Sequence, residues 1–209
     1  MESVETRTGL TFGAHPKGFN ETTLFDYMYA LFHASEYRNR YAPVLKLGFP
    51  RVLVPSDAEW FLEMAKLGAI LRTYHLLEFT PAPASLPSFP VPGANVVAAG
   101  FPRYLDAGEA DPLTGAATPS GRIYINGTDI KAGKKGQYFD GVSDAVSETR
   151  IGGYAVVARW LGDRQGRLLS GSDLDHVAKV CAALQAAAEI RAQIDQLVAG
   201  RGGMSALVA

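Results

Sequence analysis

The stretch from Asn20 to Ala34, NETTLFDYMYALFHA, decides how the chain begins to fold. Apolar side chains recur in it at three- and four-residue steps, which is the spacing of one face of an α-helix. They are Leu24, Tyr27, Met28, Leu31 and Phe32. Asn20 stands directly before them and is a favoured N-cap residue. The pattern predicts a helix from Asn20 to about Ala34, followed by a second turn or short helix from Tyr37 to Tyr41.

Outward toward the C-terminus, the next two segments predict a short strand and a second long helix. Residues 49–54 are apolar and β-branched and lie between two prolines, which favours a strand or an extended crossing. Ser56 and Glu59 have the spacing of a capping box. The helix that they open is expected to run to about Glu78. Its apolar stripe is Trp60, Met64, Leu67, Leu71 and Tyr74.

Beyond this helix the pattern changes to a proline-rich connector and then to strands. Five prolines between residues 80 and 94 exclude a helix there. Residues 96–99 and 122–126 predict strands, and residues 153–160 predict a strand or buried segment. Ser172, followed by acidic residues in the first turn, predicts a third long helix that Gly200 can end.

Together these elements predict a mixed α/β (α+β) fold, with a small sheet and long flanking helices. Residues 1–18 are expected to be a flexible segment and residues 19–199 one domain, followed by a tail at 200–209. Within that domain the helical half is 19–79, the connector 80–94, the sheet region 95–170 and the last helix 172–199.

Composition restricts the class of protein. The chain has 209 residues, 47% of them hydrophobic and 20% charged, as in an ordinary globular protein with a real core. A formal net charge of -1 means that binding to a polyanion would need a local basic patch. The single cysteine, Cys181, is expected to be a small buried residue. No signal peptide or membrane span is evident, which predicts a cytoplasmic protein without a membrane partner.

The motifs of several enzyme classes are absent together. The four histidines, His15, His33, His75 and His176, lack metal-ligand spacing and are interpreted as surface or packing residues. Neither a dinucleotide-binding nor an NTP-binding glycine loop occurs, and no nucleophile elbow or base-gripping methyltransferase element is present. We therefore expect no catalytic residues, no metal and no cofactor, and no catalysis by this chain alone.

Two groups of cationic and aromatic residues remain as candidate binding residues. The first is Tyr37, Arg38, Arg40 and Tyr41, and the second is Lys131, Lys134, Lys135, Gln137 and Tyr138. Guanidinium and ammonium groups beside rings suit phosphate and base-edge contacts. The alternative interpretation is a solvated helix end for the first group and a solubilising loop for the second.

Longer motifs indicate a family. The segments FDYMYALFH (25–33), YRNRY (37–41), LKLGFPRV (45–52), QYFDGV (137–142) and RIGGY (150–154) occur in this order. They resemble the C-terminal specificity region of type ISP restriction-modification enzymes, over roughly residues 19 to 197. The sequence departs from that pattern in Gly48, where the family prefers Asp, and in a longer link over residues 127–136.

The resemblance implies a target-recognition domain for double-stranded DNA that works beside nuclease, helicase and adenine-methyltransferase modules. S-adenosylmethionine and ATP would be used only by the parent protein. Because relatives recognise different sequences, residues of the shared motifs are expected to support the structure or contact phosphates. Base readout is expected on the loops 100–120 and 127–136. The predicted DNA-binding residues are Arg38, Arg40, Arg51, Lys131, Lys134, Lys135, Gln137, Tyr138 and Arg150.

Two alternatives remain open from the sequence. The chain could be an interaction module that docks on the catalytic subunit of a restriction-modification system through its amphipathic helices. It could also be a decayed fragment of a DNA methyltransferase.

Overall fold

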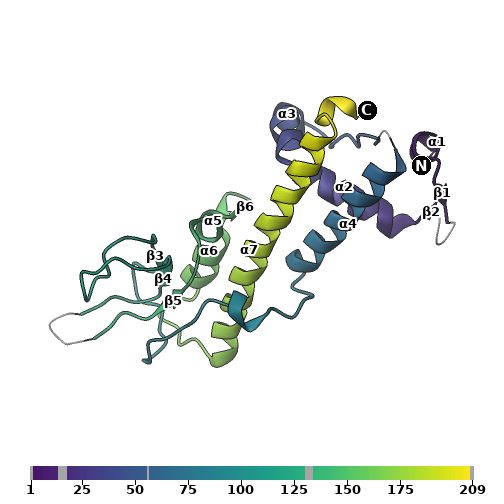
Figure 1. The fold of residues 1–209 in the computed structure, drawn as a ribbon. Helices are drawn as coiled ribbons and strands as arrows, with labels where there is room; N and C mark the ends of the chain where they lie inside the picture. The colour runs from purple at the N-terminus through teal and green to yellow at the C-terminus, as the bar shows by residue number, and fades with distance from the viewer. Residues whose placement is uncertain (1, 14–17, 56, 130–133, 208–209) are drawn as a thin grey trace. The chain divides into compact units, whose positions relative to one another are not determined.

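A computed structural model describes residues 2–13, 18–55, 57–129 and 134–207 (Figure 1). The chain forms two compact units. Unit 1 comprises residues 1–78 and 187–209, and unit 2 comprises residues 79–186. Helix α7 (Gly171–Gly200) contributes its first half to unit 2 and its second half to unit 1.

Unit 1 is built on the helices α2 (Glu21–His33), α3 (Ser35–Leu45) and α4 (Ala58–His75). Asn20 caps α2 as predicted, accepting a hydrogen bond from the Thr23 backbone amide at 2.9 Å. The axes of α2 and α4 approach closely at Gly68, where an added Cβ would overlap the carbonyl group of Asp26. Only glycine allows this contact, which brings the buried Tyr27, Leu31, Phe61 and Met64 into one core.

Residues 46–55 link α3 to α4 and do not form the predicted strand. Of the residues predicted as a strand, 49–54, only Val54 makes an isolated bridge. The segment is instead held by two tyrosines, because Tyr27 donates a hydrogen bond to the Leu53 carbonyl at 2.6 Å and Tyr37 donates one to the Arg51 carbonyl at 2.7 Å. Side-chain donors thus replace a neighbouring strand. The N-cap of α4 is Asp57, which accepts from the Trp60 amide, whereas the predicted cap Ser56 lies outside the described residues.

Both ends of the chain contain more structure than the sequence predicted. The segment expected to be flexible, 1–18, includes helix α1 (Glu2–Thr8), and strand β1 (Thr11–Phe12) pairs in parallel with β2 (Gly18–Phe19). Val4 is buried in the core of unit 1. The expected tail contains the short 3₁₀ helix η2 (Met204–Ala206), and Met204 and Leu207 are buried in the same core. Sparse apolar residues without periodicity gave no signal for these contacts.

Unit 2 contains a three-stranded antiparallel sheet in the order β3 (Arg103–Leu105), β4 (Arg122–Tyr124) and β5 (Tyr138–Asp140) (Figure 1). All three residues of the central strand β4 are buried. In the predicted connector, after the 3₁₀ helix η1 (Pro83–Ser85), Ser88 exchanges two backbone hydrogen bonds with Asp140 and extends the sheet beyond β5. The predicted strand at 96–99 is reduced to isolated bridges at Val96 and Val97.

In the second half of unit 2, most of the segment 153–160, which was predicted as a strand or buried segment, is helical. After α5 (Asp144–Glu148), a hairpin joins β6 (Arg150–Ile151) to β7 (Tyr154–Ala155), and α6 (Val156–Gly162) follows directly. Gly152 and Gly153, at φ 57° and 87°, provide the two left-handed positions of this two-residue turn. Residues 156–160 are therefore helical and not extended, with Val157 and Leu161 facing the core of unit 2.

The mixed α+β fold class is confirmed by the helices and small sheets of the two units. The expected burial of Cys181 is also confirmed, and burial raises the pKa of its thiol to about 12. Among the described helices, none is both long enough and apolar enough to cross a bilayer.

Candidate nucleic-acid interface

The two loops predicted to read bases lie around common cavities in unit 2. One cavity, of about 310 Å³, is lined by Phe101, Arg103 and Pro112 from the first loop region and by Gly127 and Thr128 from the second. A cavity of about 280 Å³ is lined by residues 111–117 of the first region and by Thr128, Lys135 and Gly136 of the second. The fold therefore brings together loops that are separated by β4.

Two exposed cations of this region, Lys134 and Lys135, lie on the second loop. Lys134 and Lys135 are exposed and also line a third cavity, of about 740 Å³, with residues 91–94. Backbone hydrogen bonds of 2.9 Å in both directions between Asp129 and Lys134 hold the two sides of the loop together. The predicted contact residue Lys131 lies outside the described residues.

The side chain of Gln137 is buried and hydrogen-bonded inside unit 2. Its side-chain oxygen accepts from the Asn95 amide and from Asn126, at 2.9 and 3.0 Å. Its nitrogen donates to the Val91 carbonyl and to the Asn95 side chain, at 3.0 and 2.7 Å. The residue is 3% exposed, so its hydrogen-bonding capacity is used inside unit 2. We therefore assign Gln137 to the support of the loop rather than to its surface.

Tyr138 is part of a buried charge network centred on Arg122. The Arg122 guanidinium bonds Asp111 at 2.6 Å and Asp140 at 2.7 Å, and its Cζ lies 4.4 Å from the centre of the Tyr138 ring. Burial alone would lower the pKa of Arg122, but the hydrogen bond to Asp140 and the neighbouring Tyr124 raise it. This network joins β4 and β5 to the loop at Asp111 and positions the cavities described above.

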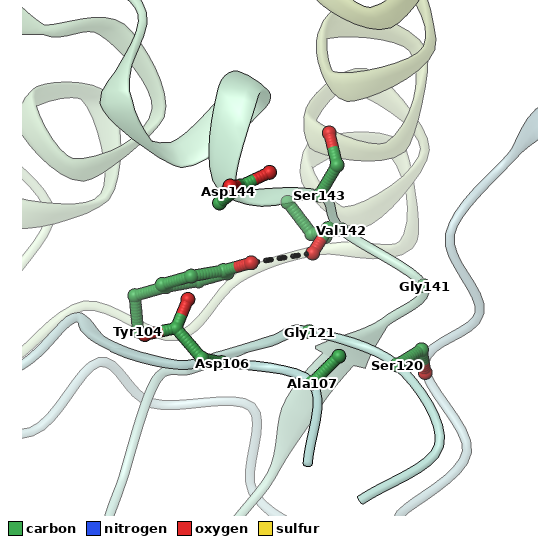
Figure 2. Close-up of a pocket in the computed structure, with 9 residues that line it drawn as sticks. All are labelled: Tyr104, Asp106, Ala107, Ser120, Gly121, Gly141, Val142, Ser143 and Asp144. Carbon is green, nitrogen blue, oxygen red and sulfur yellow. Dashed lines mark hydrogen bonds between the residues drawn. The ribbon is translucent and has the colours of Figure 1, made fainter. Parts of the chain in front are cut away.

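Unit 2 also has an acidic cavity of about 430 Å³ (Figure 2). Figure 2 shows the Tyr104 hydroxyl donating to the Val142 carbonyl, at 3.0 Å, with the side chains of Asp106 and Asp144 nearby. Burial first, and then Asp106 and Asp144, raises the pKa of Tyr104 to about 12. Carboxylates repel phosphate groups, so this cavity is unsuited to a nucleic-acid backbone.

The predicted contact residues of unit 1 are on its surface. Arg40 donates to the Ser205 hydroxyl at 3.0 Å, and Arg51 is exposed while its carbonyl accepts from Tyr37. Arg38 is exposed near His33 and Arg191, two residues that the candidate set did not include. In unit 2, Arg150 is exposed and donates across the hairpin to the Gly153 carbonyl at 3.3 Å.

Sequence reasoning also missed Arg103. This exposed residue begins β3, and its guanidinium lies over the Phe101 ring, 5.1 Å from the ring centre. The sequence signal that could have identified Arg103 is its position two residues after the aromatic Phe101, within the predicted loop 100–120. Arg191 gave no comparable signal, because it lies in the long amphipathic stretch of α7.

A helical unit combined with a unit that contains a small sheet defines the fold class as α+β. The family model described as "Type ISP C-terminal specificity domain" matches residues 6–192. The chain belongs to this family, as the sequence motifs indicated.

Solved structures with similarity to the chain are much larger. A cryo-EM structure of a DrdV–DNA complex matches with a TM-score of 0.48 and 18% identity, over 95% of this chain and 19% of that chain. The ATP-dependent Type ISP restriction-modification enzyme LlaBIII bound to DNA matches with a TM-score of 0.49 and 14% identity, over 86% of this chain and 11% of that chain. No curated protein matches.

Proposed function

We propose that this chain recognises a specific sequence in double-stranded DNA through the loops 100–120 and 127–136 of unit 2. The observation that carries the proposal is the meeting of these two loops around common cavities, with exposed Arg103, Lys134 and Lys135 at their edges. Family membership in a specificity domain supports the same function.

The roles of the cations differ in this proposal. Arg103 can present its fork of donors to a guanine edge in the major groove. Lys134 and Lys135 supply salt-sensitive contacts to phosphate groups, which fix register without selecting sequence. Gln137 and the Arg122 network hold the loops in place. Arg40, Arg51 and Arg150 remain proposed phosphate contacts.

The test is selection of bound duplexes from a random DNA pool by the full chain at two salt concentrations. We expect one enriched motif whose affinity falls with salt. The double variant K134Q/K135Q should keep the motif and lower the salt slope by about 2, because one counterion is released for about every phosphate contact. R103Q should relax the preference at one base pair, at a cost of about 1–3 kcal/mol in discrimination.

Arg159→Gln is the matched control. Arg159 is an exposed arginine of unit 2 that lies on α6, paired with Asp163 at 3.0 Å and outside the cavities described. It should leave both the motif and the salt slope unchanged. Binding to every duplex with no enriched motif and no salt dependence would contradict the proposed function.

We further infer that catalysis belongs to other modules of a restriction-modification system, where S-adenosylmethionine and ATP would be used. Docking of this chain on such a module is a second candidate function. It is favoured by the segment 44–51, in which Leu47 and Phe49 are 91% and 94% exposed. Large exposed apolar side chains that are close in sequence are found at protein contacts. The variant L47S/F49S should then lose co-purification with the methyltransferase module while it keeps its DNA motif.

A further inference from the structure

Two histidines and a tyrosine form a polar cluster on unit 1. The ring centres of His33 on α2 and His75 on α4 are 5.3 Å apart. The Tyr29 ring packs against the His33 ring at 4.6 Å, and the Tyr29 hydroxyl lies 2.6 Å from His75 Nδ1. His33 Nδ1 lies 2.8 Å from the Tyr29 carbonyl. Because a carbonyl only accepts, this nitrogen of His33 must carry the proton.

The positive charges of two guanidinium groups act on these imidazoles. Burial lowers the pKa of His33 first, and the positive charges of Arg38 on α3 and Arg191 on α7 lower it further. The pKa of His75 is lowered to about 4 by burial, by His33 and by Arg191. Burial first, and then Arg38, lowers the pKa of Arg191. Four groups that can be positive, from four helices, thus lie close enough to repel one another.

Little negative charge compensates this cluster. Within the described part of the chain, no salt bridge involves Arg38 or Arg191. Asp195 acts on Arg191, but its two carboxylate oxygens already accept hydrogen bonds from the Ser35 amide and hydroxyl, both at 2.7 Å. On the far side of Tyr29, Arg72 is paired with Asp26 at 2.7 Å.

Among the described residues, three other arginines that are partly or fully buried have carboxylate partners, whereas Arg164 donates to the Trp160 carbonyl and lies over the Trp160 ring. Arg72 binds Asp26, Arg122 binds Asp111 and Asp140, and Arg201 binds Glu59 and Glu63. Arg191 is half-buried as well, but its environment is cationic. A half-buried charge without a partner is costly unless something compensates it. An anion from outside the chain would provide that compensation.

We propose that His33, Arg38, His75 and Arg191 form a binding site for a tetrahedral oxyanion, which in the working protein is a phosphodiester group of a nucleic-acid backbone. The oxyanion chemistry follows from the cluster itself. Its assignment to nucleic acid rests on the proposed function. The site lies in unit 1 and is distinct from the base-reading loops of unit 2.

Anion binding at this site should take up protons. A bound oxyanion offsets the charges that lower the pKa of His33 and His75, so both pKa values rise on binding. Between the pKa values of the free and bound states the complex holds more protons than the free protein. Affinity for the anion therefore increases as the pH falls below about 6.5, the ordinary histidine pKa.

The first experiment uses sulfate as the probe, because sulfate does not titrate in this pH range. Histidine side-chain NMR signals of the full chain are followed during sulfate addition at several pH values. We expect the signals of His33 and His75 to shift and saturate, and their pKa values to rise. The variants R38M and R191M should each weaken sulfate binding by about tenfold or more, as expected for loss of a charge-assisted hydrogen bond.

Lys66→Gln is the matched control. Lys66 is an exposed cation on the same helix as His75, but at about 3.6 residues per turn it lies on roughly the opposite side. The substitution Lys66→Gln removes one positive charge, as R38M and R191M do, and should leave sulfate binding unchanged. Shifts that grow linearly with salt and are the same in R191M would reflect ionic screening, and they would overturn the site.

The second experiment measures binding of short duplex DNA. R191M should lower affinity equally for all sequences and keep the selected motif. Saturable sulfate binding combined with unchanged DNA affinity of R191M would overturn the assignment to a backbone phosphate. If the chain bound no DNA at all, the proposed function would fail, and the sulfate titration would still decide the anion site.

Discussion

Arg122 in unit 2 and Arg191 in unit 1 are the same residue type, both withdrawn from full contact with water, yet their surroundings are opposite. Arg122 has two carboxylates and a tyrosine ring around it. Arg191 faces a second arginine and two histidines. An arginine whose charge is balanced within the fold stabilises that fold. One whose charge is not balanced is available to an outside anion. The same side chain therefore has to be interpreted from its neighbours.

The largest effect is expected for Arg122→Met. The substitution leaves Asp111 and Asp140 without their cation, with side chains 16% and 26% exposed. Breaking a largely buried ion pair costs about 3 kcal/mol or more. Urea unfolding should show this loss in unit 2. In a W60F background, the fluorescence of Trp160, which belongs to unit 2, reports this unit alone.

Arg103→Met serves as the control for Arg122, because Arg103 is exposed and has no carboxylate partner among the described residues. It should change stability by less than about 0.5 kcal/mol. If the two substitutions cost the same, the network would not have the stabilising role assigned to it.

A much smaller change is expected for Arg191→Met. The methionine keeps the apolar contacts of the half-buried stem and removes a charge that is repelled by Arg38 and His75. Stability of unit 1 should remain within about 0.5 kcal/mol of the wild type or increase. The pKa of His75 should rise above its present value of about 4. A loss as large as that of Arg122→Met would break the comparison.

The stability of unit 1 should also depend on pH. The pKa of His75 is about 4 in the folded protein and 6.5 as its ordinary value, so the unfolded chain binds more protons between these limits. The stability linked to this group is present above pH 6.5 and is lost as the pH falls toward 4. His75→Asn should flatten this dependence in urea unfolding followed by Trp60 in a W160F background.

His176→Asn is the matched control for the pH dependence, because His176 belongs to unit 2. It should leave the pH profile of unit 1 as it is in the parent. An equal flattening by both substitutions would mean that His75 is not the titrating group.

The long helices were predictable from sequence because their signal is local. The stripe from Trp60 to Tyr74 and the Asn20 cap each lie within one element, so periodicity and capping sufficed. The segment 49–54 was predicted as a strand from its residue types, but in the described part of the chain it forms only an isolated bridge at Val54, and hydrogen bonds from Tyr27 and Tyr37 hold it instead. When hydrogen bonds from distant side chains hold a segment, the sequence of that segment contains no pattern that reveals them.

The candidate site could be predicted only in part, because some of its residues come together only through contacts between distant parts of the sequence. Loops 100–120 and 127–136 were identified from the family resemblance, and the structure places them together. Gln137 was selected because it follows the lysines, whereas four hydrogen bonds commit it to the interior. His33, His75 and Arg191 are far apart in sequence, so only the packing of helices makes them a cluster.

The division of α7 between two units has a consequence for the order in which the protein forms during translation. Unit 2, residues 79–186, is continuous in sequence, whereas unit 1 needs Ile194, Val198 and Met204 to close its core around helices made much earlier. On the ribosome, the part that begins second is therefore complete first. The helices of residues 21–75 must wait, with their apolar faces uncovered, until residues 194–204 emerge.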